Sequence, residues 1–275
     1  MKIIADSCCD LTPDLRDELG IVSIPLTMML GDKEFCDDGY LDMSGFMDEM
    51  KNNTSKVGSA SPPPYLFQEA IENAEDAFIV TLSSKLSGSY ENAVIGNKMA
   101  MEDGKGAAYV FDSKSASAGE TLIAVKLNEL IRDGKAKDEI IKMVNRFIND
   151  MKTYFVLENN DNLQNNGRLS KVKGSLLRIL DIKLIMGADG NGEIALFEMC
   201  KWTEQMLRKL LALIESSGKG TQNGNIVIAH VNNQSLAECL RTLIKERFNF
   251  KKIFIVPTGG LSSMYADDKG IVLAF

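Results

Sequence analysis

The sequence is poor in residues that bind transition metals or form disulfides. Its 275 residues include one histidine, His230, and five cysteines. The cysteines are irregularly spaced and form no CxxC pair, which argues against a zinc site and a disulfide framework. We expect reduced thiols in a cytoplasmic protein, with a redox-active pair at the adjacent Cys8 and Cys9 as the alternative.

Signatures of several enzyme classes are also missing. The sequence has no Walker A, GxGxxG or GxSxG motif, which disfavours nucleotide binding by this chain alone and an α/β-hydrolase. A serine nucleophile would have to use the single histidine as its base. The net charge of −7 comes without a basic block, which argues against nucleic-acid binding.

Long apolar runs are absent as well. None approaches the roughly 18 residues that a membrane-spanning helix needs, and the N-terminal run MKIIA is too short for a signal peptide. Hydrophobic residues nevertheless make up 45% of the chain and charged residues 25%, the balance of an ordinary globular protein.

The order of the apolar segments predicts an α/β protein with two domains. In residues 1–150, strand-like runs such as MKIIA and AFIVTL alternate with helical patterns, which is typical of parallel or mixed sheets covered by helices. Residues 151–275 add antiparallel elements, because DIKLIM and EIALFE flank the turn sequence GADGNG. We place the domain boundary near residue 151.

Local signals give more specific expectations. The run at 21–30 predicts one strand, and Ser44 is expected to cap a helix that ends at Asn52. Three consecutive prolines within residues 58–64 predict a break that excludes a helix or a central strand.

Two carboxylates follow the first predicted strand, in the segment DSCCD. Asp6 and Asp10 would lie at the carboxyl end of that strand, where ligands of open α/β sheets bind. They could hold a magnesium ion or a substrate hydroxyl for a metal-assisted enzyme. Alternatively they stabilise a turn and cap the helix that begins near Pro13, a role also open to Thr12.

The segment SSKLSGSYENA places hydroxyl groups where a strand leads into a helix. Ser87 occupies the expected N-cap position, and Gly88 allows another group to approach the backbone. Free N–H groups and the helix dipole at such a position suit a carboxylate or phosphate. Ordinary helix capping is the alternative.

Two further segments carry weaker signals. In GSASPPP, Ser59 and Ser61 precede a rigid proline block that could fix their hydroxyls, or that could serve simply as a stiff linker. In NGRLSK, Arg168 offers a planar guanidinium suited to a carboxylate or phosphate, or it is a solvated loop arginine.

Together these segments resemble the DegV family of bacterial fatty-acid-binding proteins over nearly the whole chain. ADSCCDLTPDL resembles the family's opening segment, and IPLTMMLGDKEFCDD its second strand and hairpin. SASPPPYLF stands where the family usually has Thr-Ser-Gln-Pro-Ser, and SSKLSGSYENA where it has Ser-Gly-Thr-Tyr. NGRLSK is a near-verbatim match, and DIKLIM with the hairpin after it also fits.

The resemblance implies two α/β domains that enclose one long-chain fatty acid in an apolar tunnel. Family members of this kind are non-catalytic subunits that present the acyl carboxylate to a separate ATP-dependent fatty acid kinase subunit. No metal or other cofactor is implied. By resemblance, Ser59 takes the place of a threonine ligand, Ser87 beside Gly88 that of the helix-terminus serine, and Arg168 that of an arginine near the head group.

The C-terminal segment departs from the family pattern. SSMYADDKG, residues 262–270, stands where the family usually has Gly-Thr-His-Thr-Gly-Pro-Gly, so that Tyr265 replaces the histidine. A phenol can donate a hydrogen bond to a carboxylate but carries no positive charge near neutral pH. Besides delivery to a kinase, the sequence therefore leaves open a fatty-acid buffer or sensor without kinase coupling, and the enzyme that uses Asp6 and Asp10.

Overall fold

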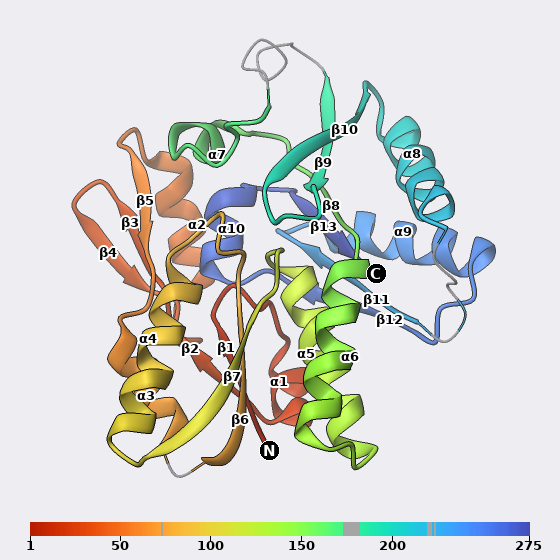
Figure 1. Cartoon of the computed structure of the whole chain (residues 1–275). Helices are drawn as coiled ribbons and strands as arrows, with labels where there is room; N and C mark the ends of the chain where they lie inside the picture. Colours follow the sequence, from red (N-terminus) through yellow and green to blue (C-terminus); the bar gives the residue numbers. More distant parts are fainter. Residues whose placement is uncertain (73, 173–181, 219–221, 223) are drawn as a thin grey trace.

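One sheet of the protein is built from the first half of the chain. The computed structural model describes the chain apart from residues 73, 173–181, 219–221 and 223 (Figure 1). The first sheet has four parallel strands. In spatial order they are β2 (Ile21–Ile24), β1 (Lys2–Asp6), β6 (Ala74–Thr81) and β7 (Gly106–Asp112).

Helices cover both faces of this sheet. Apolar side chains of α3 (Pro64–Ile71) and α4 (Ser89–Glu102) pack on one face, around Phe67, Ile79 and Ala93. The other face contacts three helices, which are α1 (Pro13–Leu19), α5 (Ala118–Arg132) and α6 (Lys137–Asp150). Burial of large apolar side chains at about 25 cal/mol per Å² supplies most of the stability of such layers.

The second sheet is mixed and uses the second half of the chain. Its six strands lie in the order β10 (Ile194–Cys200), β9 (Lys183–Ala188), β8 (Thr153–Val156), β13 (Ile271–Ala274), β11 (Asn225–His230) and β12 (Lys252–Pro257). Strands β11 and β12 are parallel, and the other neighbours are antiparallel. Helices α8 (Thr203–Ser216) and α9 (Gln234–Arg247) pack on one face of it (Figure 1).

Helix α5 connects the two sheets through one apolar core. It packs against β1 and β6 of the first sheet and against β11 and β13 of the second. The core around it therefore contains Phe78 and Val80 together with Val227 and Val272. The boundary near residue 151 stays a prediction, since the main core includes residues from both sides of it.

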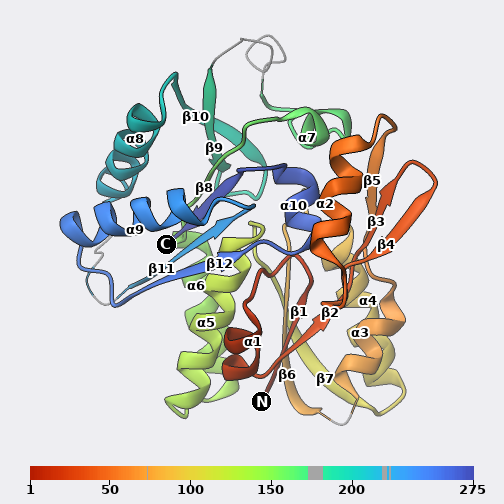
Figure 2. The same cartoon turned by 180° about the vertical axis from the view of Figure 1, so that it is seen from behind.

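A small antiparallel sheet completes the fold. It consists of β4 (Lys33–Cys36), β3 (Thr27–Leu30) and β5 (Val57–Ala60). Helix α2 (Met43–Asn52) lies beside it, next to α10 (Gly260–Ala266) and near α7 (Asp161–Asn165), as Figure 2 shows. Segments from both ends of the chain thus meet here. Among the described residues, no helix has the length and apolar character needed to cross a membrane.

The predicted α/β class is confirmed, whereas several local expectations were wrong. The single strand expected at 21–30 is interrupted at Pro25, and its two parts enter different sheets. At 58–64 no central strand occurs, as predicted, because β5 is an edge strand that ends at Ala60 before the prolines. The exclusion of a helix was wrong at Pro64, which begins α3, because proline is compatible with a first helical turn.

Other expectations also differ from the structure or concern residues outside the described ones. Asp42, rather than Ser44, caps α2 by accepting hydrogen bonds from the N–H groups of Ser44 and Gly45. The sequence did not predict α10. Position 181 of the strand expected at 181–186, and position 73 of the helix expected from Tyr65, lie outside the described residues.

Candidate functional site

A mostly apolar cavity lies where the carboxyl ends of the first sheet's strands meet the second sheet. About 890 Å³ of space there is free of protein atoms, a volume that includes open solvent at the mouth. Leu82 and Leu86 line it from the segment after β6, and Phe155 and Val272 line it from the second sheet. The cavity therefore uses parts of the chain far apart in sequence.

Four of the five predicted site residues line this cavity. They are Ser59, Ser87, Arg168 and Tyr265. The hydroxyl oxygens of Ser59 and Tyr265 are 2.9 Å apart, and the guanidinium carbon of Arg168 lies 5.8 Å from the centre of the Tyr265 ring. We call these four residues the polar mouth of the cavity.

Ser87 does not cap α4 as the sequence predicted. The helix begins at Ser89 and Gly88 is its N-cap residue, which places Gly88 beside the mouth rather than in the cavity lining. The Ser87 hydroxyl oxygen instead accepts a hydrogen bond from the backbone N–H of Ser89, at 3.2 Å. Its hydroxyl hydrogen remains available to donate to an anion.

Hydrogen bonds to the backbone orient Arg168. Its Nε donates to the carbonyl oxygen of Leu86 at 3.2 Å, and its Nη1 donates to that of Asn166 at 2.6 Å. Because Leu86 precedes Ser87, the guanidinium also holds the segment that carries this serine. These bonds take two of the five N–H donors of a guanidinium.

Asp6 holds the segment that leads into α4 by hydrogen bonds. It is fully buried. One of its oxygens accepts hydrogen bonds from the N–H of Leu82, at 2.9 Å, and from the hydroxyl of Ser89, while the other accepts from the N–H of Cys8. Such bonds offset the free energy of burying a polar group.

Asp10 and Asp37 anchor the start of α10, the helix that carries Tyr265. Asp10 accepts hydrogen bonds from the N–H of Gly259, at 2.7 Å, and from the hydroxyl of Ser117. Asp37, whose role the sequence analysis missed, accepts from the N–H groups of Gly260 and Leu261. Negative side chains at a helix N-terminus also interact favourably with the helix dipole.

These contacts support the structural interpretation of the two acids in DSCCD. Thr12 caps α1 by accepting a hydrogen bond from the N–H of Leu15, so Asp10 is not that cap. The oxygens of Asp6 and Asp10 are engaged by donors of the protein. Among the described residues, no group of three or more His, Cys, Asp or Glu side chains is placed to hold a metal ion.

The thiols of Cys8 and Cys9 are poorly suited to redox chemistry. Both are buried and free. Burial, reinforced by the nearby carboxyl groups, raises the pKa of both thiols well above the usual value. The nucleophilic thiolate is therefore disfavoured, which argues against the redox-active pair.

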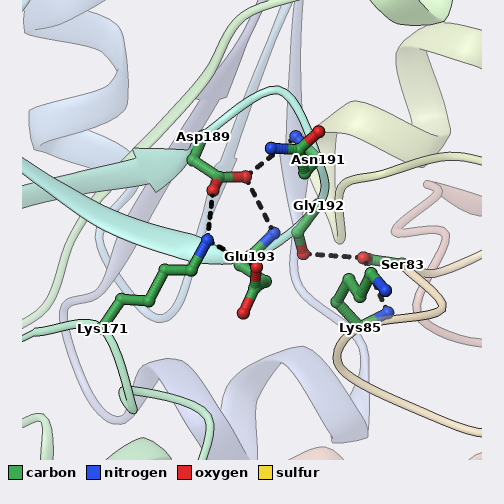
Figure 3. Close-up of polar contacts among 7 residues, drawn as sticks. All are labelled: Ser83, Lys85, Lys171, Asp189, Asn191, Gly192 and Glu193. Atoms are coloured by element: carbon green, nitrogen blue, oxygen red, sulfur yellow. Dashed lines mark hydrogen bonds and ion pairs between the residues drawn. The ribbon is translucent and has the colours of Figure 1, made fainter.

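The turn between β9 and β10 lines one side of the cavity. Figure 3 shows the contacts of this turn with Ser83 and Lys171. The hydroxyl of Ser83 donates to the carbonyl oxygen of Gly192 at 2.7 Å. Lys171 forms ion pairs with Asp189 and Glu193, at 2.8 and 2.5 Å, and lowers the pKa of Asp189 to about 2. The turn sequence GADGNG indicated the hairpin but gave no sign of its contact with Ser83.

Gly192 is required for this contact. Its φ is +91°, and a Cβ atom there would lie 2.3 Å from the hydroxyl oxygen of Ser83. Glycine tolerates both the positive φ and the close approach.

Comparison with known proteins assigns the chain to a family. The DegV family model matches residues 1–274. The chain belongs to the DegV family. Among curated DegV relatives, a DegV domain-containing protein of Streptococcus pneumoniae is 34% identical over 279 residues, which cover 100% of this chain and 98% of that protein. A DegV domain-containing protein of Streptococcus gordonii is 32% identical, with the same coverage.

Solved DegV structures share the fold. A DegV family protein of Ruminococcus gnavus, described with vaccenic acid, is 36% identical with a TM-score of 0.95, over 100% of this chain and 99% of that chain. The Streptococcus pneumoniae Fatty Acid Kinase (Fak) B3 protein, loaded with linoleic acid, is 32% identical with a TM-score of 0.91, over 100% and 98%. Structurally similar DegV proteins thus bind fatty acids.

Because the Asp10 carboxyl is buried, we expect the free energy of unfolding to depend on pH. Burial raises the pKa of Asp10 from 3.8 to about 7, so the folded state holds this proton more tightly than the unfolded state. The resulting stabilisation is complete below the unfolded pKa and is lost as pH rises through about 7. We expect Asp10→Asn, which stays neutral, to show a smaller fall in the free energy of unfolding between about pH 5 and 8, by up to about 3 kcal/mol.

Urea unfolding at several pH values measures this fall. Asp14→Asn, an exposed position in the first turn of α1, is the matched control and should keep the wild-type pH dependence. An unchanged slope in Asp10→Asn would show that the Asp10 carboxyl does not carry the proton.

Proposed function

We propose that this DegV protein binds one long-chain fatty acid, with the acyl chain in the cavity and the carboxylate at the polar mouth. The observation that supports this most directly is the meeting of Ser59, Ser87, Arg168 and Tyr265 at one apolar cavity. Fatty acids bound to the related proteins of R. gnavus and S. pneumoniae give independent support.

The mouth offers the carboxylate several donors. Ser87 has a free hydroxyl hydrogen, as described above. Ser59 and Tyr265 share one hydrogen bond between their two hydroxyl groups, which leaves one further O–H to donate. Remaining N–H groups of Arg168 can add a charge-assisted bond. The carboxylate is thus bound without a metal ion.

The apolar chain should dominate affinity. A sixteen-carbon acid has about fourteen methylenes, each stabilised by ~0.8 kcal/mol on burial, which gives on the order of 11 kcal/mol before the costs of association. The helix terminus adds only about 0.3–2 kcal/mol for an anion. The mouth therefore sets the orientation of the ligand more than its affinity.

We further propose that the protein is not catalytic alone and presents the carboxylate to an ATP-dependent fatty acid kinase subunit. The name of the S. pneumoniae Fatty Acid Kinase B3 protein supports this partner. A buffer or sensor without kinase coupling is the second candidate, favoured by the neutral phenol of Tyr265 at the position where the family usually has histidine.

Lipid extraction tests the central proposal. We expect mass spectrometry of an organic extract of the purified protein to detect a long-chain fatty acid, and the delipidated protein to rebind heptadecanoic acid at about one molecule per chain. Protein that neither co-purifies with an acyl chain nor binds one would contradict the proposed function.

Ser87→Ala should weaken head-group binding modestly, because one donor is lost while the apolar contacts remain. A loss of about 0.5–1.5 kcal/mol corresponds to roughly a 2- to 12-fold increase in Kd for heptadecanoic acid. Ser84→Ala is the matched control, since Ser84 bonds to Asp112 and lies outside the cavity lining. Equal affinities in wild type and Ser87→Ala would show that Ser87 does not bind the carboxylate and serves only as the acceptor of the Ser89 N–H.

Arg168→Ala should separate binding from phosphoryl transfer. We expect a Kd for heptadecanoic acid within about threefold of wild type, because the acyl chain dominates affinity. Acyl phosphate formation with a kinase subunit and ATP should fall at least about tenfold, because a guanidinium stabilises charge on a transferring phosphoryl group. A rate of acyl phosphate formation in the variant equal to that of wild type would refute this role. If wild type itself forms no acyl phosphate, the fatty-acid buffer or sensor without kinase coupling is favoured.

A further inference from the structure

Glu120 is an unexpected residue in the centre of the protein. It lies near the start of α5, and neither its side chain nor that of Asp6 is exposed to solvent. Neither of its carboxyl oxygens has a hydrogen-bond partner of good geometry among the described residues. An ionised carboxylate in this environment would be strongly destabilised.

The groups that act on Glu120 are themselves acidic. Asp6 at the end of β1 is its main electrostatic neighbour, and Cys8 and Asp10 follow from the segment after that strand. Asp37 acts in turn on Asp10 from the segment after β4. Burial, together with the Asp6 charge, raises the pKa of Glu120 well above its usual value. Two neighbouring buried carboxyl groups cannot both ionise readily, so they share a proton.

A chain of hydrogen bonds leads from this pair to the polar mouth. The Asp6 oxygen that accepts from Leu82 also accepts from the hydroxyl of Ser89. The backbone N–H of Ser89 then donates to the hydroxyl oxygen of Ser87. Changes at Asp6 can therefore reach Ser87 through two consecutive contacts, both made by one residue at the start of α4.

We propose that Asp6 and Glu120 form a buried proton-sharing pair that positions Ser87 and couples binding of the acyl carboxylate to uptake of a proton. The inference rests on the proposed fatty-acid binding but goes beyond it. Asp6 and Glu120 are positioning residues, since they act through Ser89 and Ser87 rather than on the ligand itself. In this pair Glu120 carries the proton, and its carboxyl can turn to donate to the neighbouring Asp6, which keeps one negative charge to accept from Leu82 and Ser89.

The sign of the coupling follows from electrostatics. A carboxylate arriving at the mouth adds negative charge and favours the protonated form of the pair below it. Binding and protonation therefore stabilise each other, and the affinity for the fatty acid falls as pH rises through the range where the pair titrates. One proton taken up per ligand corresponds to about a tenfold loss of affinity per pH unit.

The test compares an acid and an alcohol with the same chain. Dissociation constants of heptadecanoic acid and heptadecanol are measured for delipidated wild type and Glu120→Gln over a pH series that extends well above the usual titration range of a carboxyl group. We expect the affinity of wild type for the acid to fall by up to about tenfold per pH unit. In Glu120→Gln, which is neutral and retains a donor to Asp6, the fall should be much smaller.

The controls distinguish the effect of the Asp6–Glu120 pair on affinity from the effects of other groups that titrate in the protein or the ligand. Heptadecanol should bind both proteins with little pH dependence, and ionisation of the free acid affects both proteins equally. Glu129→Gln on the same helix, where Glu129 pairs with Lys251 away from the cavity, should keep the wild-type slope. Equal slopes in wild type and Glu120→Gln would overturn the inference while leaving fatty-acid binding intact.

A measurement without any variant covers the case in which Glu120→Gln does not fold. Calorimetric titration of wild type in buffers of different ionisation enthalpy counts the protons taken up on binding. The titration is repeated across the same pH series: uptake with heptadecanoic acid, but not with heptadecanol, supports the pair, and no uptake with either at any pH overturns it. Failure of both ligands to bind at any pH would instead defeat the proposed function itself.

Discussion

Buried carboxylates that accept backbone N–H groups hold the candidate site together. Asp6 anchors the segment from Leu82 to Ser89, and Asp10 and Asp37 anchor the start of α10. A buried polar group is tolerated only when hydrogen bonds replace water, so these contacts strongly restrict how the segments can be arranged. Because the segments carry Ser87 and Tyr265, their anchors also determine the geometry of the polar mouth.

Helix α5 provides the second constraint, since it packs against both sheets. Its apolar residues fix the distance between the sheets, and the cavity lies beside the segment that leads into this helix. In that segment Ser117 has a φ of +56°, which is uncommon for a residue other than glycine, and its hydroxyl donates to Asp10. The same short segment thus links the core, the cavity wall and the anchor of α10.

Much of the fold followed from sequence periodicity, because apolar runs such as AFIVTL and NIVIAH are buried strands whose local pattern agrees with their final environment. Pro25 was harder to interpret, since only the tertiary structure separates β2 from β3. Helix α10 was missed because its seven residues are held by Asp10 and Asp37, which are more than 200 positions away. Contacts at that separation leave no local signal.

In the candidate site, too, residues with a local sequence signal could be predicted, and a residue defined only by its tertiary surroundings could not. Ser59, Ser87, Arg168 and Tyr265 could be selected from the sequence, because hydroxyls beside a helix start and a planar guanidinium are recognisable chemistry and the family resemblance marks their positions. Glu120 could not be selected, since a glutamate in an amphipathic helix is ordinarily solvated, and only its zero exposure in the folded protein distinguishes it.

The hydroxyl donors and the Arg168 guanidinium at the mouth are physically compatible with the proton that we propose Asp6 and Glu120 share. If the hydrocarbon chain supplies most of the affinity, the head group does not need a permanent strong cation pair, and the carboxylate stays accessible to a partner. The proton that we propose for the Asp6–Glu120 pair would then compensate part of the charge that the ligand brings. The negative charge of the whole chain, −7, makes such local compensation more valuable, because it disfavours any added anion.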